Sequence, residues 1–543
     1  MATIMNHFFK HIGRSVAGGS LAALTLLLSG CGDFLEATSQ DQDYVRSWQD
    51  MNELLVGSCY MPVKPSEQYE YVGAVNYGTF LHLVGDEVHE VNTKGTTAAY
   101  EPHYYIFGYY TWQQRSGQNE TYTDAYAENT EWTKVYNAIN VANNILAKAE
   151  KLPQTTEDER QGYLKVTGEA YFLRAFYYFW LVNIYGQPYR PSTAATDLGV
   201  TLKTTPEVEN RIFGRNTVQE TYDQVLADLQ EADTRLSQYT APKKSIYRAD
   251  SVAVHLLRSR VYLYMQDWDK AAEYARKAIA EHPTLMNLNG NSAAFMTKTN
   301  PENIFSMGGD DVPCLLLSGA LGLTVSDDQY NTYSANDQRR AQWFWNLGTF
   351  HGLTKRAVGN KNTDLDITDK EYYYKAYYAG LKDDKSPVSS LFWLRSSEAY
   401  LNLAEAEACL GHSAEARAAL LQQMAARYKA GAPELSLDGV SDADLVALVR
   451  KERRREFVLE GQRWFDLRRY RVCSVQPSRI AITHDYTYYK NHTSQEPTET
   501  RRFVLTEDDA SWTLPMPTEV LEFNVGMPGN GNQWRTYTTV KVY

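Results

Sequence analysis

Aromatic rings and hydrogen-bonding side chains crowd into one segment of the sequence, residues 100–115. A flat ring with a polar edge can stack on the C–H face of a pyranose, while amide or guanidinium groups bind its hydroxyls. This chemistry would suit the capture of a sugar. The residues we predict as ligand contacts are Tyr109, Tyr110, Trp112, Gln113 and Arg115.

Part of the same segment could instead belong to the core. Tyr104, Ile106, Gly108 and Tyr110 alternate along the chain, as in a strand with one buried face. Large helical proteins also bury many aromatic rings, so both interpretations stay open at this stage.

A second aromatic pair, Trp343 and Trp345, follows Asp337 and Arg339. In an extended chain, residues two apart point to the same face. The pair is a further candidate for ligand contact, as part of an aromatic platform, or it packs on the scaffold. A third cluster, residues 372–378, is predicted as a strand near the core.

Paired carboxylates could serve glycoside hydrolysis, which needs two acids about 5–9 Å apart. Glu456 and Glu460 have a spacing that would suit this, but they lie among arginines on an otherwise apolar helix. Unpaired buried charge is costly, so we interpret them as members of an ion-pair network. The motifs of serine hydrolases, zinc proteases, P-loops and dinucleotide sites are absent from the sequence. We therefore predict no catalytic residue.

An oxygen-rich run, residues 360–371, only loosely resembles a calcium loop. It lacks the turn glycine of an EF-hand, and a solvated acidic turn explains it equally well. We therefore predict no metal ion and no cofactor, with calcium left as the weak alternative.

The N-terminus carries an export signal. Basic residues precede an apolar run at 16–28, which is shorter than the roughly 20 residues of a membrane span. The run ends in Leu28-Ser29-Gly30-Cys31, a pattern typical of a bacterial lipobox. We predict cleavage before Cys31 and acylation of that residue, which anchors the chain to a membrane. An ordinary secretion signal with a chance cysteine is the alternative.

Composition sets further bounds on the 543-residue chain. Its hydrophobic fraction of 43% supplies a large core, and its formal charge of −12 disfavours nucleic-acid binding. The five cysteines are widely spaced, so no disulfide framework or zinc site is expected. Cys409 is expected as a small buried apolar residue of an Ala-rich helix.

Most of the remaining pattern is helical. Apolar residues recur at helical spacing, and Thr217 with Glu220 predicts a capped helix start. The predicted helices span 132–146, 156–185, 217–236, 250–265, 268–280, 392–410, 413–428 and 441–470. Several pair into hairpins of about 34 residues, the length of a tetratricopeptide unit.

Long stretches rich in Tyr, Gly, Asn and Thr separate the helices, and they must pack on the scaffold and carry short strands. The predicted fold is mainly α: a tetratricopeptide-like helical-hairpin scaffold with long irregular loops and a few short strands. The expected division is a signal peptide at 1–30, a lipidated tether at 31–45, an N-terminal helical part at 46–290 and a loop-rich C-terminal part at 291–543.

Five segments in order resemble one family, the SusD-like (RagB/SusD) outer-membrane lipoproteins. They are Cys31-Gly32-Asp33-Phe34-Leu35; Trp132, Tyr136, Ile139, Ala142 and Asn143; Gly168 to Ala175 with Tyr185 to Pro188; Glu452 to Glu456 with Glu460 to Arg469; and Leu514 to Pro517 with Glu519 and Asn524.

The resemblance implies a surface-facing, lipid-anchored, non-enzymatic protein of the outer membrane. Such proteins act as lids on a SusC-like TonB-dependent transporter and deliver captured oligosaccharides or peptides to it. In this family the insertion that corresponds to 100–112 commonly carries sugar-stacking aromatics. A glycan is the expected ligand; a peptide ligand, a surface glycosidase and a purely structural adaptor are the alternatives.

Overall fold

The computed structural model describes residues 47–62, 78–90, 101–117, 130–243, 245–291, 294–309, 323–347, 350–353, 355, 388–491, 494 and 496–543. The predicted signal peptide, Cys31, the tether, the acidic run at 360–371 and the tyrosine cluster at 372–378 lie outside these residues.

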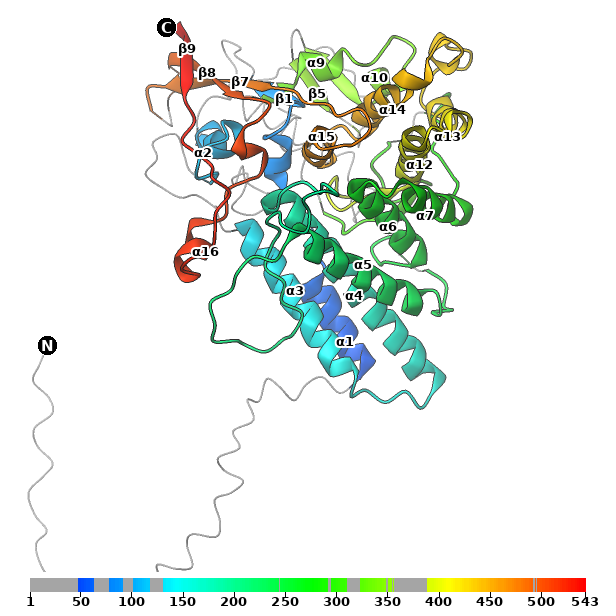
Figure 1. The fold of residues 1–543 in the computed structure, drawn as a ribbon. Helices are drawn as coiled ribbons and strands as arrows, with labels where there is room; N and C mark the ends of the chain where they lie inside the picture. Colours follow the sequence, from blue (N-terminus) through cyan, green and yellow to red (C-terminus); the bar gives the residue numbers. More distant parts are fainter. Residues whose placement is uncertain are drawn as a thin grey trace, which may run out of the picture.

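Helices dominate the described chain, which confirms the predicted mainly-α fold (Figure 1). The longer ones are α2 (Glu101–Tyr110), α3 (Thr130–Ala149), α4 (Glu157–Tyr185), α5 (Val218–Leu236), α6 (Ser251–Met265), α7 (Trp268–Glu281), α12 (Ser396–Leu410), α13 (Ser413–Ala425), α14 (Asp442–Glu456) and α15 (Arg463–Arg471). The shorter ones are α1 (Trp48–Leu54), α9 (Asp327–Tyr330), α10 (Gln338–Gln342) and α16 (Thr518–Phe523).

Local sequence sets several of these boundaries. Thr217 and Glu220 form the predicted capping box at the start of α5, in which each side chain bonds the other residue's backbone N–H. The helix α12 ends at Gly411, whose φ of 82° lies in the left-handed region that suits glycine.

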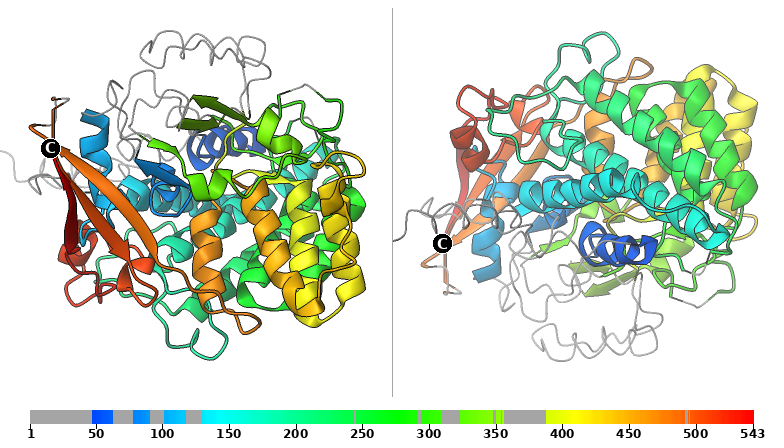
Figure 2. Two further views of the ribbon diagram at one scale, coloured as in Figure 1. Left: turned by 90° about the horizontal axis from the view of Figure 1, so that it is seen from above. Right: turned by 90° about the horizontal axis from the view of Figure 1, so that it is seen from below.

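The helices stack as a series of hairpins. α4 packs between α3 and α5, α6 pairs with α7, and α12 packs on both α7 and α13. Figures 1 and 2 show the α6/α7 and α12/α13 hairpins at one end of the molecule and the strand-bearing C-terminal segment at the other. Each hairpin buries its apolar face only against its neighbours, as in a solenoid.

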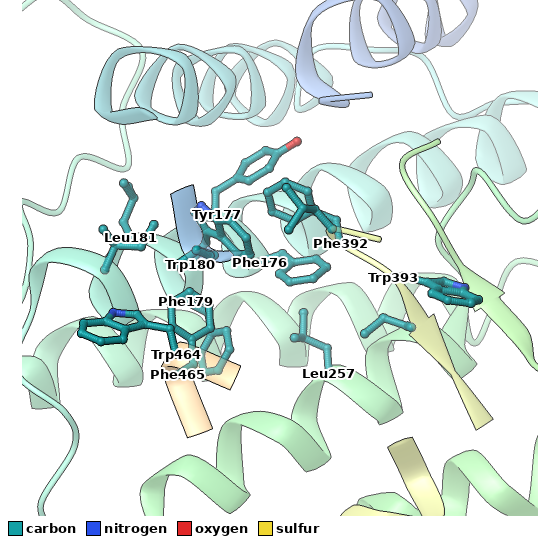
Figure 3. Packing of buried hydrophobic residues seen from close by; sticks show 14 of the residues in the cluster. Phe176, Tyr177, Phe179, Trp180, Leu181, Leu257, Phe392, Trp393, Trp464 and Phe465 are labelled. Carbon is teal, nitrogen blue, oxygen red and sulfur yellow. The ribbon is translucent and has the colours of Figure 1, made fainter. Parts of the chain in front are cut away.

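The core centres on α4 (Figure 3). Its Trp180 ring lies 4.4 Å from Phe392 and 5.4 Å from Phe465, measured between centroids. Phe176 meets Phe392 edge to face at 5.3 Å. These contacts join the N-terminal helices to residues from the C-terminal half, so the two halves share one core.

The strands are short. They are β1 (Val88–Glu90), β2 (Asn303–Phe305), β3 (Leu323–Val325), β4 (Phe344–Leu347), β5 (Phe350–Leu353), β6 (Leu394–Arg395), β7 (Ile482–Tyr489), β8 (Pro497–Leu505) and β9 (Tyr537–Val542). They form the antiparallel pairs β1–β3, β2–β6 and β4–β5 and the antiparallel sheet β7–β8–β9.

One alternative and one expectation about local structure are wrong. The strand that the alternation at 104–110 would also fit is the helix α2, which packs on the sheet through Phe107, 5.1 Å from the Tyr486 ring. The single helix expected at 441–470 is two helices, α14 and α15. Leu459 and Gly461 between them have positive φ values of 54° and 71°, which no α-helix accommodates.

None of the described helices combines the length and the apolar character needed to cross a bilayer.

Candidate functional site

The aromatic side chains of the predicted segment at 100–115 point into the protein interior where the structure describes them. Tyr110 and Trp112 hold the imidazole of His484 between their rings, at centroid distances of 4.1 and 4.4 Å. The indole N–H of Trp112 donates to the carbonyl of Val84 at 2.9 Å. The Tyr110 and Trp112 side chains are buried, and Tyr109 stacks on Phe80. We call Tyr110, Trp112 and His484 the histidine cluster.

The polar neighbours of the cluster mainly serve the fold. Gln113 is buried; its side chain donates to the Thr111 hydroxyl at 2.9 Å and accepts the Arg535 backbone N–H at 3.2 Å. Arg115 is half-buried. This segment therefore ties α2 to the C-terminal residues.

Burial lowers the pKa of His484 to about 4, although hydrogen-bond contacts with the carbonyls of Tyr110 and Gly85 favour the protonated ring. The imidazole is therefore neutral at neutral pH. It can donate to only one of the two carbonyls in that state.

The two residues of the second predicted pair, Trp343 and Trp345, differ in what the structure shows of them. Trp343 is buried against Phe295, with ring centroids 4.7 Å apart, and the ammonium nitrogen of Lys355 lies 4.2 Å from its ring. Trp345 belongs to β4, and its side chain lies outside the described part of the chain. Contact with a ligand stays a prediction for all seven residues that the sequence suggested. In this structure Tyr109, Tyr110, Trp112, Gln113 and Trp343 present no open face.

One exposed ring, Phe523, and three half-buried ones lie between α3 and α16. A hollow of about 290 Å³ is bounded by apolar and aromatic side chains together with polar ones. Its lining residues are Trp132, Thr133, Tyr136, Thr201, Lys203, Phe213, Glu519, Val520, Phe523, Asn524 and Met527. We call this hollow the aromatic groove.

Three elements build the aromatic groove. Trp132 and Tyr136 lie one turn apart on α3, with centroids separated by 4.6 Å, and the Tyr136 hydroxyl donates to the Thr201 carbonyl at 2.7 Å. Asn524 accepts the Phe213 backbone N–H at 2.9 Å, which fastens the 201–216 loop to the end of α16.

Phe523 forms the open edge of this groove and is 76% exposed. Apolar surface of this kind, next to Thr, Lys, Glu and Asn groups, combines a stacking face with hydrogen-bonding partners. Trp132, Tyr136 and Asn524 were expected only as family motifs and not as ligand contacts. The signal was a Trp and a Tyr four residues apart on one helix face.

A larger cleft of about 720 Å³ lies between α14, α15 and the end of α9. Its arginines are paired: Arg450 with Glu405 at 3.1 Å, and Arg463 with Asp86 at 2.7 Å. Lys451 is its exposed cation. Its lining carries four cationic side chains and one carboxylate, Asp328, and its aromatic residue Tyr470 is buried, so the lining offers no exposed stacking ring.

The carboxylates of Glu456 and Glu460 lie in the interior, as the ion-pair interpretation predicts. Glu456 pairs with Arg339 at 2.9 Å and with Arg427 at 2.7 Å, and Glu460 pairs with Arg395 at 3.0 Å. Although burial opposes it, the charges of Arg427 and Arg395 hold the pKa of Glu456 well below its usual range. An ionised, fully paired carboxylate is a poor general acid.

Metal ligation finds no support in the described residues, which contain no cluster of three or more His, Cys, Asp or Glu side chains suited to an ion.

Comparison with known proteins defines the family. Residues 77–263 match a SusD-like family model described as starch-binding and associating with the outer membrane, and residues 322–534 match the SusD family model. The chain belongs to the SusD (RagB/SusD) family, and it is an outer-membrane-associated protein on that ground.

Individual relatives agree. SusD-like protein P2 of Formosa agariphila is 24% identical over 381 residues, which cover 63% of this chain and 71% of that protein. A SusD superfamily structure from Bacteroides thetaiotaomicron has a TM-score of 0.64 at 21% identity, covering 90% of this chain and all of the other. A putative sugar-binding protein from Bacteroides vulgatus has a TM-score of 0.64 at 22% identity, covering 90% and 99% of the two chains.

Proposed function

We propose that this chain is a non-catalytic lipoprotein of the outer-membrane surface that captures an oligo- or polysaccharide and passes it to a SusC-like TonB-dependent transporter. Membership of a family described as starch-binding carries the proposal. The similar Bacteroides vulgatus protein is described as a putative sugar-binding protein, which agrees with it.

The aromatic groove is the part of the described surface that we assign to the ligand. Trp132 and Phe523 offer ring faces there, and Lys203, Glu519 and Asn524 offer polar groups. The histidine cluster contributes no residue to this groove, and it fixes the course of the chain after α2.

Retardation in native gels cast with a panel of polysaccharides tests this assignment. The chain from residue 32 should be slowed by at least one polymer, and Phe523→Ala should weaken that retardation. Trp534→Ala is the matched control, because Trp534 is an exposed aromatic residue outside the groove. Retardation that survives Phe523→Ala and Trp132→Ala would move the ligand away from the groove.

A peptide ligand is the second candidate, since an aromatic groove also accepts apolar side chains. Mass analysis of material eluted from the purified protein separates the two. Co-purified peptides, together with no retardation by any polysaccharide, would replace the glycan.

The hydrolase alternative is disfavoured by the ion pairs of Glu456 and Glu460. The pure protein should release no reducing ends from a retarded polymer. Release that is abolished by Glu456→Gln in a folded variant would revive the hydrolase.

The lipid anchor and the transporter are tested in the cell. Cys31→Ala should move the chain from the membrane fraction to the soluble fraction. A TonB-dependent transporter should co-purify with the wild-type chain in mild detergent, and its absence from every preparation would contradict the lid role.

A further inference from the structure

Two cysteines from distant parts of the sequence meet beside α14. Cys409 lies in the last turn of α12, and Cys473 lies just after α15. Their thiols are hydrogen-bonded to each other. Cys473 is buried and Cys409 is half-buried. The expectation that Cys409 is only a small core residue therefore misses its neighbour.

Contacts of Arg450 are a separate observation that places Cys473 beside α12. Arg450 of α14 donates from Nη2 to the Cys473 sulfur at 3.1 Å and pairs through Nε with Glu405 at 3.1 Å. Glu405 and Cys409 are four residues apart on α12 and so share one helix face. Arg450 thus holds Cys473 against the face of α12 that carries Cys409.

We propose that Cys409 and Cys473 are joined by a disulfide bond in the mature, exported protein. The contact of Arg450 with the Cys473 sulfur and the hydrogen bond between the thiols hold the two sulfurs near each other, as bond formation requires. Outer-membrane association places the chain in an oxidising compartment during its export, where such bonds form and persist.

The chemistry is thiol–disulfide exchange with a disulfide-containing oxidant. The Cys473 thiolate attacks one sulfur of the oxidant; the oxidant's S–S bond breaks, and its first thiolate leaves and takes a proton from solvent. Cys409 then loses its proton and attacks the Cys473 sulfur of the mixed disulfide, which expels the second thiolate with that proton. The two cysteine sulfurs are oxidised, and the two sulfurs of the oxidant are reduced.

Cys473 is suited to the first step. Its hydrogen bond with Cys409 and the charge of Arg450, acting against burial, lower its pKa to about 6. The same hydrogen bond and burial raise the pKa of Cys409. Near neutral pH Cys473 is therefore the nucleophile of the first step, and Cys409 keeps its proton until the second step.

The bond would also shape the larger cleft between α14 and α15. Gln476, Pro477 and Ser478, which line that cleft, closely follow Cys473. A link to α12 would close a loop of about 60 residues and fasten this wall to the hairpin scaffold.

Peptide mapping of the full chain, exported and purified with N-ethylmaleimide and without reductant, tests the proposal. We expect a linked peptide pair containing Cys409 and Cys473, about 2 Da lighter than the sum of the free peptides because two protons and two electrons are lost. Cys59 should be alkylated after denaturation. Reductant should convert the pair to two alkylated peptides. Alkylated Cys409 and Cys473 in the unreduced sample, or linkage of either to another cysteine, would overturn the proposal.

A second measurement tests whether the disulfide can form in the purified protein, independently of how the protein was exported. Reduced protein is treated with oxidised dithiothreitol, and its Tm is recorded before and after. The wild type and Cys59→Ala should gain on the order of 5 °C. Cys409→Ser and Cys473→Ser should gain nothing, and equal shifts in all four proteins would also overturn the proposal.

Discussion

Aromatic side chains face opposite ways in two regions of this molecule. In the histidine cluster, Tyr110 and Trp112 close around His484 and leave no exposed face. In the aromatic groove, Phe523 is 76% exposed and Trp132 is only partly covered. Both regions are dense in rings, so ring density alone does not mark a binding surface; the backbone around the rings decides which way they face.

The backbone explains the difference. Trp112 has a φ of 52°, a left-handed turn that ends α2 and directs its indole N–H toward the Val84 carbonyl. Trp132 lies instead in the first turn of a regular helix, with the short helix α16 and the 201–216 loop opposite. α16 has six residues and cannot cover the whole side of α3.

The largest expected effect follows from the burial of Trp112. Trp112→Ala should lower the free energy of unfolding by about 3–5 kcal/mol, because it leaves a cavity beside His484 and an unpaired Val84 carbonyl. Chemical denaturation measures it. Phe523→Ala should change stability by less than about 0.5 kcal/mol. Equal costs for the two variants would remove the distinction between the regions.

Titration of His484 gives the next largest effect. Its folded pKa of about 4 lies below the value near 6.5 expected in the unfolded chain. The unfolded state therefore binds a proton first as the pH falls, and this contribution to stability is present above pH 6.5 and lost toward pH 4. Between pH 7.5 and pH 4.5 the wild type should lose about 2–3 kcal/mol more than His484→Gln.

Denaturation curves of both proteins at a series of pH values check this difference. Neighbouring groups that act on His484, such as Asp86 and His89, are present in both proteins, so their own titration largely cancels. Parallel pH profiles for the two proteins would contradict the neutral, buried imidazole.

Much of the scaffold could be predicted from the sequence because its signals are local. Helical periodicity and the cap at Thr217 placed α5 to within one residue. The break between α14 and α15 could not be predicted in this way, because Leu459 takes a positive φ only where Glu87, far away in the sequence, accepts its N–H at 2.9 Å.

The candidate site was less accessible to sequence reasoning. The composition of 100–115 suggested outward rings, but His484, nearly 400 residues away, turns Tyr110 and Trp112 inward. Trp132 and Phe523 form one groove only because α16 returns to α3 at the end of the chain. Contacts over such sequence distances leave no trace in local spacing.

Ligand affinity, unlike stability, should be more sensitive to substitutions in the aromatic groove than to substitutions in the histidine cluster. Trp132→Ala should weaken glycan binding by about 1 kcal/mol, roughly fivefold, because one stacking face is lost. Affinity electrophoresis at several polymer concentrations gives the dissociation constants. Circular dichroism must show a folded protein, since Trp132 also lies 5.3 Å from Tyr185. Unchanged affinity in a folded variant would exclude this ring from the site.

The smallest expected effect concerns the hydrogen bond that closes the aromatic groove. Asn524→Ala removes the acceptor for the Phe213 N–H and frees the 201–216 loop from α16. We expect a loss of stability of about 1 kcal/mol and a roughly two- to threefold loss of affinity, since one neutral hydrogen bond contributes about that much.

Asn524→Asp separates the two roles of this residue. The carboxylate keeps the acceptor for Phe213 but loses the amide donor, which bonds the Val520 carbonyl at 2.9 Å within α16. If the contact with the loop sets the shape of the aromatic groove, the aspartate variant should bind nearly as tightly as the wild type, while the alanine variant does not. If both variants bind equally weakly, the affinity depends on the C-terminal end of α16 and not on the contact with the 201–216 loop. The groove would then be formed by α3 and α16 alone, and Phe213 would not belong to the site.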